Sequence, residues 1–170
     1  MTQARNVTAT FTPFVPPVIG HPTDFDGDSK ADILWRHGST GQVTVWLMNG
    51  PTIVTVATVA QVSDPGWQVV GIADVNGDGK ADLLWHHTIT GQVTVWLMNG
   101  PTIATVATVA QVSDPGWQIA RVIDVNGDGK ADLVWHHTTT GQVTVWLMNG
   151  TQILQAVGVA QVGDLDWQIQ

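Results

Sequence analysis

The segment GQVTVWLMNG occurs three times without a change, at residues 41–50, 91–100 and 141–150. Valine alternates with threonine ahead of a tryptophan, and an Asn-Gly pair ends the segment. This pattern is typical of a short β-strand that runs into a turn. The interval between copies is 50 residues.

Two other segments repeat at the same interval, on either side of the first. QVSDPGW occurs at 61–67 and 111–117 and changes to QVGDLDW at 161–167, while DVNGDGKAD occurs at 74–82 and 124–132, with DFDGDSKAD at 24–32. A constant period without insertions indicates three copies of one structural unit. We expect a single domain over 1–170 with repeats at about 18–66, 67–116 and 117–166, and residues 167–170 starting a further blade.

Each unit is predicted to hold four strands. In the second unit we expect them at Trp67–Ala73, Ala81–His87, Gln92–Met98 and Ile103–Val112. Loops rich in Asp, Gly, Asn and Pro separate them, which is typical of an all-β protein, and no segment has helix caps with a 3.6-residue period. Large side chains occupy both faces of these strands, which favours a β-propeller of three four-stranded blades per chain. A parallel β-helix is the structural alternative.

Composition excludes several classes of protein. Of 170 residues, 44% are hydrophobic and 12% charged, which argues against disorder. No stretch reaches the ~20 apolar residues of a membrane span, and no signal-peptide pattern is visible in Met1–Gly20. Cysteine, glutamate and tyrosine are absent, and the net charge of −8 disfavours nucleic acid and anionic membranes as partners.

The repeated aspartate loop predicts a cation site. Oxygen-bearing side chains stand at loop positions 1, 3, 5 and 9, with glycines between them, and the backbone carbonyl at position 7 would add a ligand. Many oxygen ligands on a tight loop suit calcium. We expect about one Ca²⁺ per repeat, held by Asp24, Asp26, Asp28, Lys30 and Asp32; by Asp74, Asn76, Asp78, Lys80 and Asp82; and by Asp124, Asn126, Asp128, Lys130 and Asp132.

The alternatives to calcium are specific. An EF-hand would need Glu at position 12, where this chain has Trp35, Trp85 or Trp135. Magnesium demands stricter octahedral geometry. A turn rich in Asp and Asn that is capped by its own backbone would need no ion.

DVNGDGKADLLW followed by GQVTVWLMNG resembles the FG-GAP/VCBS repeats of integrin α-chain propellers, bacterial surface proteins and some propeller lectins. The resemblance covers about residues 18–170. It implies a propeller blade whose first loop binds calcium through positions 1, 3, 5, 7 and 9, and a location outside the cell or at its surface. The literal Phe-Gly and Gly-Ala-Pro words of the family name are missing here.

A ligand site is expected at the end of each blade away from calcium. The loop between the second and third strands and the loop between blades meet there, with Trp beside polar groups. The candidates are Asp64, Trp67, His86, His87, Gln92, Asp114, Trp117, His136, His137 and Gln142. Tryptophan could stack on a sugar here, although Trp85 and Trp96 suit packing between blades. The adjacent His pairs point to opposite faces of a strand, which disfavours zinc.

The preferred function is a non-enzymatic, calcium-stabilised module, a multivalent lectin that binds carbohydrate. No arrangement typical of catalysis is visible. A structural scaffold or protein-adhesion module is the alternative, as is an engineered consensus propeller without a ligand. Three blades cannot close a ring, so we expect a homo-oligomer, preferably a six-bladed dimer, completed by exchange of the strand at 167–170.

Overall fold

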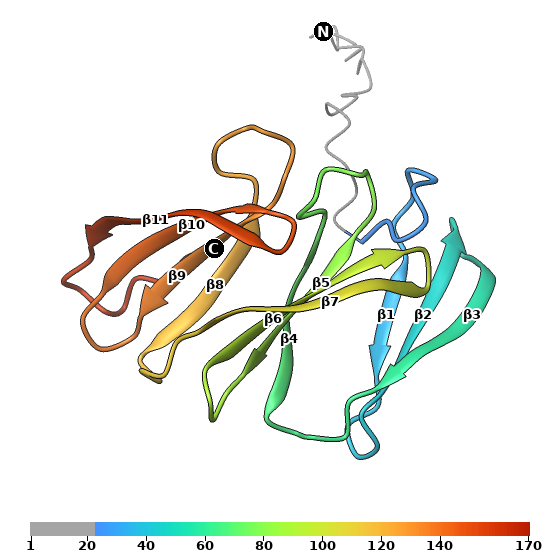
Figure 1. Ribbon diagram of the computed structural model, residues 1–170, viewed down its shortest axis with the longest axis horizontal. Coiled ribbons are helices and arrows are strands. Elements are labelled where there is room, and N and C mark those ends of the chain that lie inside the picture. The colour runs from blue at the N-terminus through green and yellow to red at the C-terminus, as the bar shows by residue number, and fades with distance from the viewer. Residues whose placement is uncertain (1–22) are drawn as a thin grey trace, which may run out of the picture.

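A computed structural model describes residues 23–170, which form three antiparallel sheets and no helix (Figure 1). The first sheet has three strands and the other two have four each. The strands are β1 (Ile33–Arg36), β2 (Gln42–Asn49), β3 (Thr52–Gln61), β4 (Trp67–Ala73), β5 (Asp82–His87), β6 (Gln92–Asn99), β7 (Thr102–Gln111), β8 (Trp117–Ile123), β9 (Asp132–His137), β10 (Gln142–Asn149) and β11 (Gln152–Gln161).

Every sheet is a meander in which each strand pairs with the next along the chain. The register repeats between units: Trp35 lies opposite Thr44 in the first sheet as Trp85 lies opposite Thr94 in the second. The all-β prediction is therefore confirmed. The four strands predicted for the second unit are confirmed to within one or two residues at their ends.

Within residues 23–170, the first sheet differs from the other two because no strand corresponds to their first strand. The segment that corresponds to that strand by the 50-residue period, 17–23, lies outside the described residues except for Thr23. At the other end of the chain, residues 167–170 belong to no sheet in the single chain.

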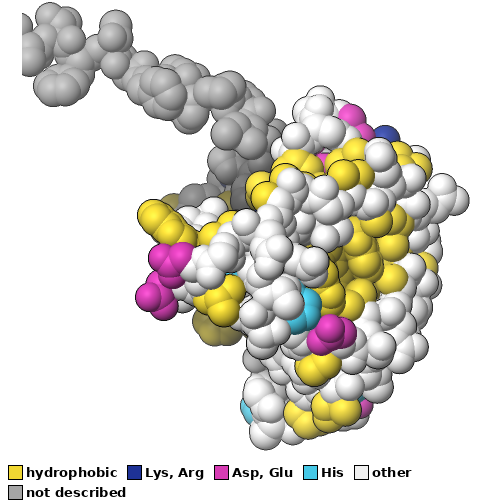
Figure 2. Space-filling view, turned by 90° about the vertical axis from the view of Figure 1, so that its left-hand side faces the viewer, with side chains coloured by type: hydrophobic (Ala, Val, Ile, Leu, Met, Phe, Trp, Pro, Cys, Tyr) yellow, Lys and Arg dark blue, Asp and Glu magenta, His cyan; other side chains and the backbone are white. Residues whose placement is uncertain are grey.

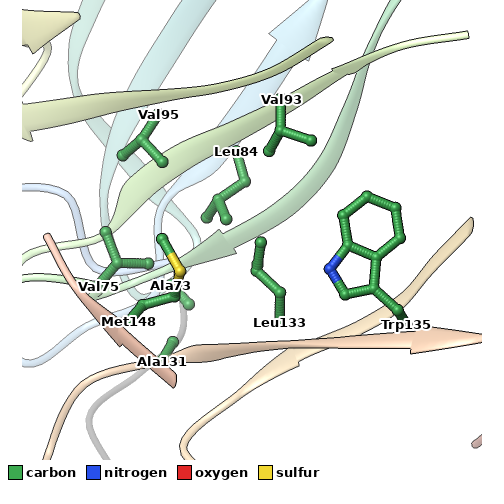
Figure 3. Packing of buried hydrophobic residues seen from close by; sticks show 9 residues of the cluster. All are labelled: Ala73, Val75, Leu84, Val93, Val95, Ala131, Leu133, Trp135 and Met148. Atoms are coloured by element: carbon green, nitrogen blue, oxygen red, sulfur yellow. The ribbon is translucent and has the colours of Figure 1, made fainter. Parts of the chain in front are cut away.

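The hydrophobic core lies between the sheets rather than within one of them. Between the second and third sheets, Ala73, Val75, Leu84, Val93 and Val95 face Ala131, Leu133, Trp135 and Met148 (Figure 3). Between the first and second sheets the corresponding cluster is Phe25, Val43, Val45, Ala81, Leu83, Trp85 and Met98. Both faces of the second sheet are therefore buried, which explains why both parities of its strands carry large side chains.

Backbone hydrogen bonds also join one sheet to the next. The amide of Ala81 donates to the carbonyl of Asp24 at 2.6 Å, and that of Gly100 donates to Phe25 at 2.9 Å. The same pair recurs one repeat later, from Ala131 to Asp74 and from Gly150 to Val75, at 2.7 and 2.6 Å. The aspartate loop of each sheet is thus fixed to the following sheet.

The chain between residues 23 and 170 contains no helix that is long and apolar enough to cross a membrane.

Candidate calcium loops and aromatic cavities

The three aspartate loops lie at one end of the sheets, and the turns before β2, β6 and β10 lie at the other (Figure 1). Strands of a meander alternate in direction, so the loop before the second strand of a blade cannot share an end with the turn after that strand. The predicted separation of the calcium end from the ligand end follows from this topology.

Each loop winds around the carboxylate at its first position. In the second loop, Asp74 accepts hydrogen bonds from the amides of Asn76, Gly77 and Gly79 at 3.1, 2.6 and 2.8 Å. Gly77 and Gly79 have φ values of +83° and +82°, a conformation that side chains disfavour. Ser29 takes the place of the second glycine in the first loop and adopts φ +66°.

The side chains at positions 3 and 5 also cap the loop. Asn76 Oδ1 accepts the amide of Asp78 at 2.8 Å, and Asp78 Oδ1 accepts that of Lys80 at 2.9 Å. The third loop repeats both bonds at Asn126 and Asp128. The capped Asp/Asn turn weighed against calcium is thus present, and each of these oxygens retains lone pairs for a cation.

In the first loop the carboxylates converge. Asp24, Asp26 and Asp28 each offer an oxygen, and these oxygens lie within 4.8 Å of one another. Burial raises the pKa of Asp26, the amide of Asp28 lowers it, and the neighbouring carboxylates raise it further. Lys30 offsets part of the negative charge through an ion pair of 2.5 Å with Asp28. Three acidic oxygens this close are suited to a hard cation.

The aspartate at position 9 has a structural role that the spacing alone did not reveal. Asp82 is fully buried and accepts the amides of Val75 and Met98 at 3.1 and 2.8 Å. It therefore ties the loop to β6, and Asp32 and Asp132 make the same pair of bonds in their own sheets. Its place directly before an apolar strand was the available sequence signal.

Burial shifts the pKa of the aspartate at this position. Burial raises the pKa of Asp82 to about 7, against the opposing effect of the Met98 and Val75 amides, and Asp78 and Asp74 raise it further. Burial also raises the pKa of Asp132. The pocket thus favours neutralisation of Asp82, by a proton or by a bound cation.

At the opposite end of the sheets, the side chain of His87 caps the turn that follows it. Its Nε2 lies 3.2 Å from Asp64 Oδ2, and its Nδ1 accepts the amides of Ile89 and Thr90 at 3.2 Å. The amide of Gly66 and the ring of His87 lower the pKa of Asp64. His137 and Asp114 repeat this arrangement, so both histidine rings are engaged within the protein.

The other predicted ligand residues line cavities. Trp67 and Gln92 line one of about 300 Å³ together with Trp85, Trp96, Thr94 and Thr108. His86 and Trp117 line a second of about 240 Å³ between the second and third sheets. Trp117 and Gln142 line a third, and His136 lines a fourth beside Trp167. The structure therefore places the candidates in several cavities rather than one.

The tryptophans combine packing with cavity lining. Trp85 is 1% exposed and packs against Trp96 with ring centroids 4.9 Å apart, as Trp135 and Trp146 do at 4.8 Å. Packing between blades, the interpretation preferred for Trp85, is confirmed. The indole Nε1 atoms of Trp85 and Trp135 are buried without a hydrogen-bond partner.

Comparison with known proteins agrees with this architecture. An FG-GAP-like repeat matches residues 24–85 and an FG-GAP repeat matches residues 115–146. The fold and the aspartate loops define a class of protein built from repeated antiparallel β-blades with an aspartate-rich first loop. Within that class, the chain belongs to the FG-GAP repeat proteins.

Among solved structures, the chain is similar to a chain of the Tc holotoxin pore of Photorhabdus luminescens. The TM-score is 0.52 at 22% identity, over 75% of this chain and 6% of that chain. At this identity the likeness supports the fold alone, and the matched region is a small part of the toxin chain. No curated protein sequence gives a significant match.

Proposed function

We propose that this chain is a calcium-stabilised, non-enzymatic module that binds carbohydrate at the end of its blades away from the metal. The observation that carries the proposal is the cavity of about 300 Å³ that joins Trp67, Trp85 and Trp96 to Gln92, Thr94 and Thr108. Aromatic faces beside hydroxyl and amide groups match the apolar faces and hydroxyl groups of a sugar ring.

The three aspartate loops support the proposal that the chain binds calcium. FG-GAP repeats typically bind Ca²⁺, and the first loop brings three carboxylates together. Positions 1, 3 and 5 of the other two loops present Asp, Asn and Asp in the same turn. The residues present therefore fit a hard, oxygen-seeking cation. We assign Asp24, Asp26 and Asp28, and their counterparts in the other loops, as side-chain ligands.

Calcium should raise the melting temperature, and a chelator should lower it. A ligand that binds only the folded state adds about 2.7 kcal/mol per site at a hundredfold excess over Kd. Thermal melts in millimolar calcium, millimolar magnesium and chelator test this. Asp78→Ala should remove one class of sites in a calcium titration, whereas Asp166→Ala, outside the loops, should not. Equal melts in calcium and in chelator would contradict the assignment.

The aromatic cavity proposed to bind sugar occurs in more than one blade, which favours a multivalent lectin. Trp117, Trp135, Trp146 and Thr144 line a smaller cavity of about 120 Å³ in the third blade, matching the larger one in the second. Several weak copies of one site on a rigid scaffold gain affinity for a surface that displays many sugars.

A glycan array tests the carbohydrate proposal. We expect binding that free sugar inhibits, and we expect Trp67→Ala to weaken it while the calcium-dependent melt remains. Val54→Ala is the control, because Val54 is 64% exposed on β3 and lines none of the cavities described above. A blank array from calcium-loaded protein would reject the lectin and favour the second candidate, a scaffold or adhesion module. The engineered, ligand-free propeller predicts the same blank array.

The family suggests a location outside the cell or at its surface, where millimolar calcium would fill weak sites. We propose that location. Secretion of a tagged chain from its native host is the direct test.

A further inference from the structure

The three sheets stack in a row, and two internal interfaces join them. The free face at each end of the row corresponds to one of the two sides of such an interface. In the interface between the first two sheets, the second sheet contributes its leading face, which consists of Ala81, Leu83, Trp85 and Met98. The first sheet contributes its trailing face, which consists of Phe25, Val43 and Val45. The corresponding positions of the other sheets carry the same names. The first sheet presents a leading face without a neighbour among the described residues. The third sheet presents a trailing face without one.

The leading face of the first sheet is exposed where its copies are buried. Trp35 is 49% exposed and Ile33 is 38% exposed, whereas Trp85 and Leu83 are 1% and 0% exposed at the same positions of the second sheet. Ala31 and Gly50 are also exposed, unlike their copies in both later repeats.

The trailing face of the third sheet shows the same contrast. Ile123 and Val125 are 47% and 45% exposed, whereas Ala73 and Val75 are 6% and 0% exposed. Figure 2 looks onto this side of the molecule, where hydrophobic side chains gather on the surface. The apolar surface on both faces has the composition of the internal core.

The polar parts of the interface are also left open. Inside the chain, the carbonyls at the first two loop positions accept amides from the next sheet. Among the described residues, the carbonyls of Asp124 and Val125 accept no such bond from a following sheet, and the amides of Ala31 and Gly50 donate none to a preceding one.

The lysine at position 7 of each loop packs across the internal interfaces in the same way. The Cε of Lys80 lies 3.7 Å from the position a Cβ would take at Gly27, and the Cε of Lys130 lies 3.4 Å from the corresponding position at Gly77. Each internal interface therefore places a lysine beside the acidic loop of the preceding sheet. The space beside Gly127 is open, and Lys30 is the lysine that would fill it.

A cation or an imidazole also meets a tryptophan at each internal interface. The guanidinium of Arg36 lies 5.5 Å from the centroid of Trp85, and the ring of His86 packs edge-on against Trp135 at 5.8 Å. His136 is the third member of this series, and Trp35 is the tryptophan that, within residues 23–170, has no cation or imidazole of a preceding sheet against it.

From these five correspondences we propose that a second copy of the chain seats its first sheet on the third sheet of the first copy. Ile123, Val125 and His136 then face Ile33 and Trp35 of the second copy. The amides of the second copy's Ala31 and Gly50 donate to Asp124 and Val125. Two such contacts related by a twofold axis close a ring of six blades, within the usual range for propellers.

The open edge of β1 suits the same partner. Trp67 pairs with His87 and Gln68 with His86 in the second sheet. Trp167-Gln168-Ile169 repeats the start of that strand, and β1 has no partner on its outer edge among the described residues. In the closed ring, Trp167 of one copy pairs with His37 of the other, and residues 167–170 supply a strand at the outer edge of β1, which has none among residues 23–170.

Light scattering on the full chain in calcium tests the assembly. The expected mass is twice the 18.2 kDa of one chain. Trp35→Asp on the leading face and Val125→Asp on the trailing face should each reduce the mass to one chain. Ile89→Asp is the control, because Ile89 is 82% exposed on a turn outside both faces. A wild-type chain that stays monomeric at micromolar concentration would overturn the proposal.

Mixing the two variants tests the head-to-tail geometry. Each variant retains one intact face, so an equimolar mixture should regain a mass of two chains, whereas neither variant does so alone. Retention of the dimer by Val125→Asp alone, or no recovery on mixing, would reject this interface. Circular dichroism of each variant in chelator is the folding control, because Val125 lies within the third aspartate loop and its substitution also acts on the proposed calcium site. Failure of the wild-type chain to assemble would leave its calcium-dependent melt and its sugar binding to be measured separately. That failure is therefore distinguishable from failure of the calcium and sugar proposals.

Discussion

At the scale of single residues, the aspartates of one loop have two different environments. Those at positions 1, 3 and 5 cap exposed or partly exposed turns, whereas Asp82 is buried between two amides of different segments. Five positions that look equivalent as oxygen donors in the sequence are therefore not equivalent in the fold. Position 9 holds the loop against the sheet through these two hydrogen bonds.

Removing calcium should make stability depend on pH through Asp82. Burial raises its pKa from 3.8 to about 7, so the folded protein retains a proton that the unfolded chain releases. The free energy of unfolding should therefore fall as pH rises through this window, by at most about 1.4 kcal/mol per pH unit. Denaturant melts in chelator measure it.

Asp82→Asn is the control for this pH profile. The substitution places an amide in the same pocket and removes the titratable group, so the fall in stability attributed to Asp82 should be absent from the variant. Stability at low pH should also be lower in this variant, because the NH2 group of Asn would face one of the two N–H donors, whereas the hydroxyl oxygen of the protonated acid retains an acceptor lone pair. Parallel pH profiles of the two proteins would contradict the prediction.

At the scale of elements, the glycine in the turn before β6 allows that turn to lie directly against the linker to the next blade. Gly91 has φ +72°, and a Cβ there would lie 1.7 Å from the carbonyl oxygen of Val112. The amide of Val112 donates to the carbonyl of Gly91 at 2.8 Å. The turn and the linker between blades are thus in backbone contact, with no room for a side chain.

Gly91→Ala should destabilise the protein more than Gly100→Ala. Both glycines have positive φ, but a Cβ at Gly100 would meet no atom within 4 Å. Backbone strain alone costs about 1–2 kcal/mol, and Gly91→Ala adds displacement of the linker. Urea unfolding of the two variants compares them directly. Equal losses of stability would mean that the linker moves at little cost.

At the scale of the whole molecule, position in the array decides how much a repeated residue contributes. Trp35 and Trp85 both pack on a tryptophan of the neighbouring strand at 4.9 Å. Only Trp85 also has a preceding sheet against it, with Phe25, Val43 and Val45 in the same core cluster. Identical local sequence therefore gives different burial.

Trp85→Ala should cost about 3–5 kcal/mol, the usual range for a buried tryptophan. Trp35→Ala should cost less than about half of that when the chain is held monomeric by Val125→Asp, because half of its surface is already in water. Denaturant unfolding in that background measures both. A similar cost at the two positions would show that Trp35 is buried in the monomer.

The sequence by itself determined the repeat, the strands and the loops, because each depends on local chemistry. Asn-Gly and Asp-Pro-Gly segments end strands, and alternating Asp, Asn and Gly form a turn that collects oxygen atoms, wherever the unit stands in the chain. The family and the direction of the strands follow from these features, and so does the separation of the two ends of a blade.

The tertiary structure decided what identical segments do in different places. Sequence could not show that Asp82 is buried and accepts hydrogen bonds from two segments, or that His87 accepts hydrogen bonds from the turn that follows it. Nor could it show that the ligand candidates divide among several cavities. It also could not show that Trp35 is exposed while Trp85 is buried. These properties depend on which sheet packs against which, and that contact is made between neighbouring repeats of the chain, far apart in sequence.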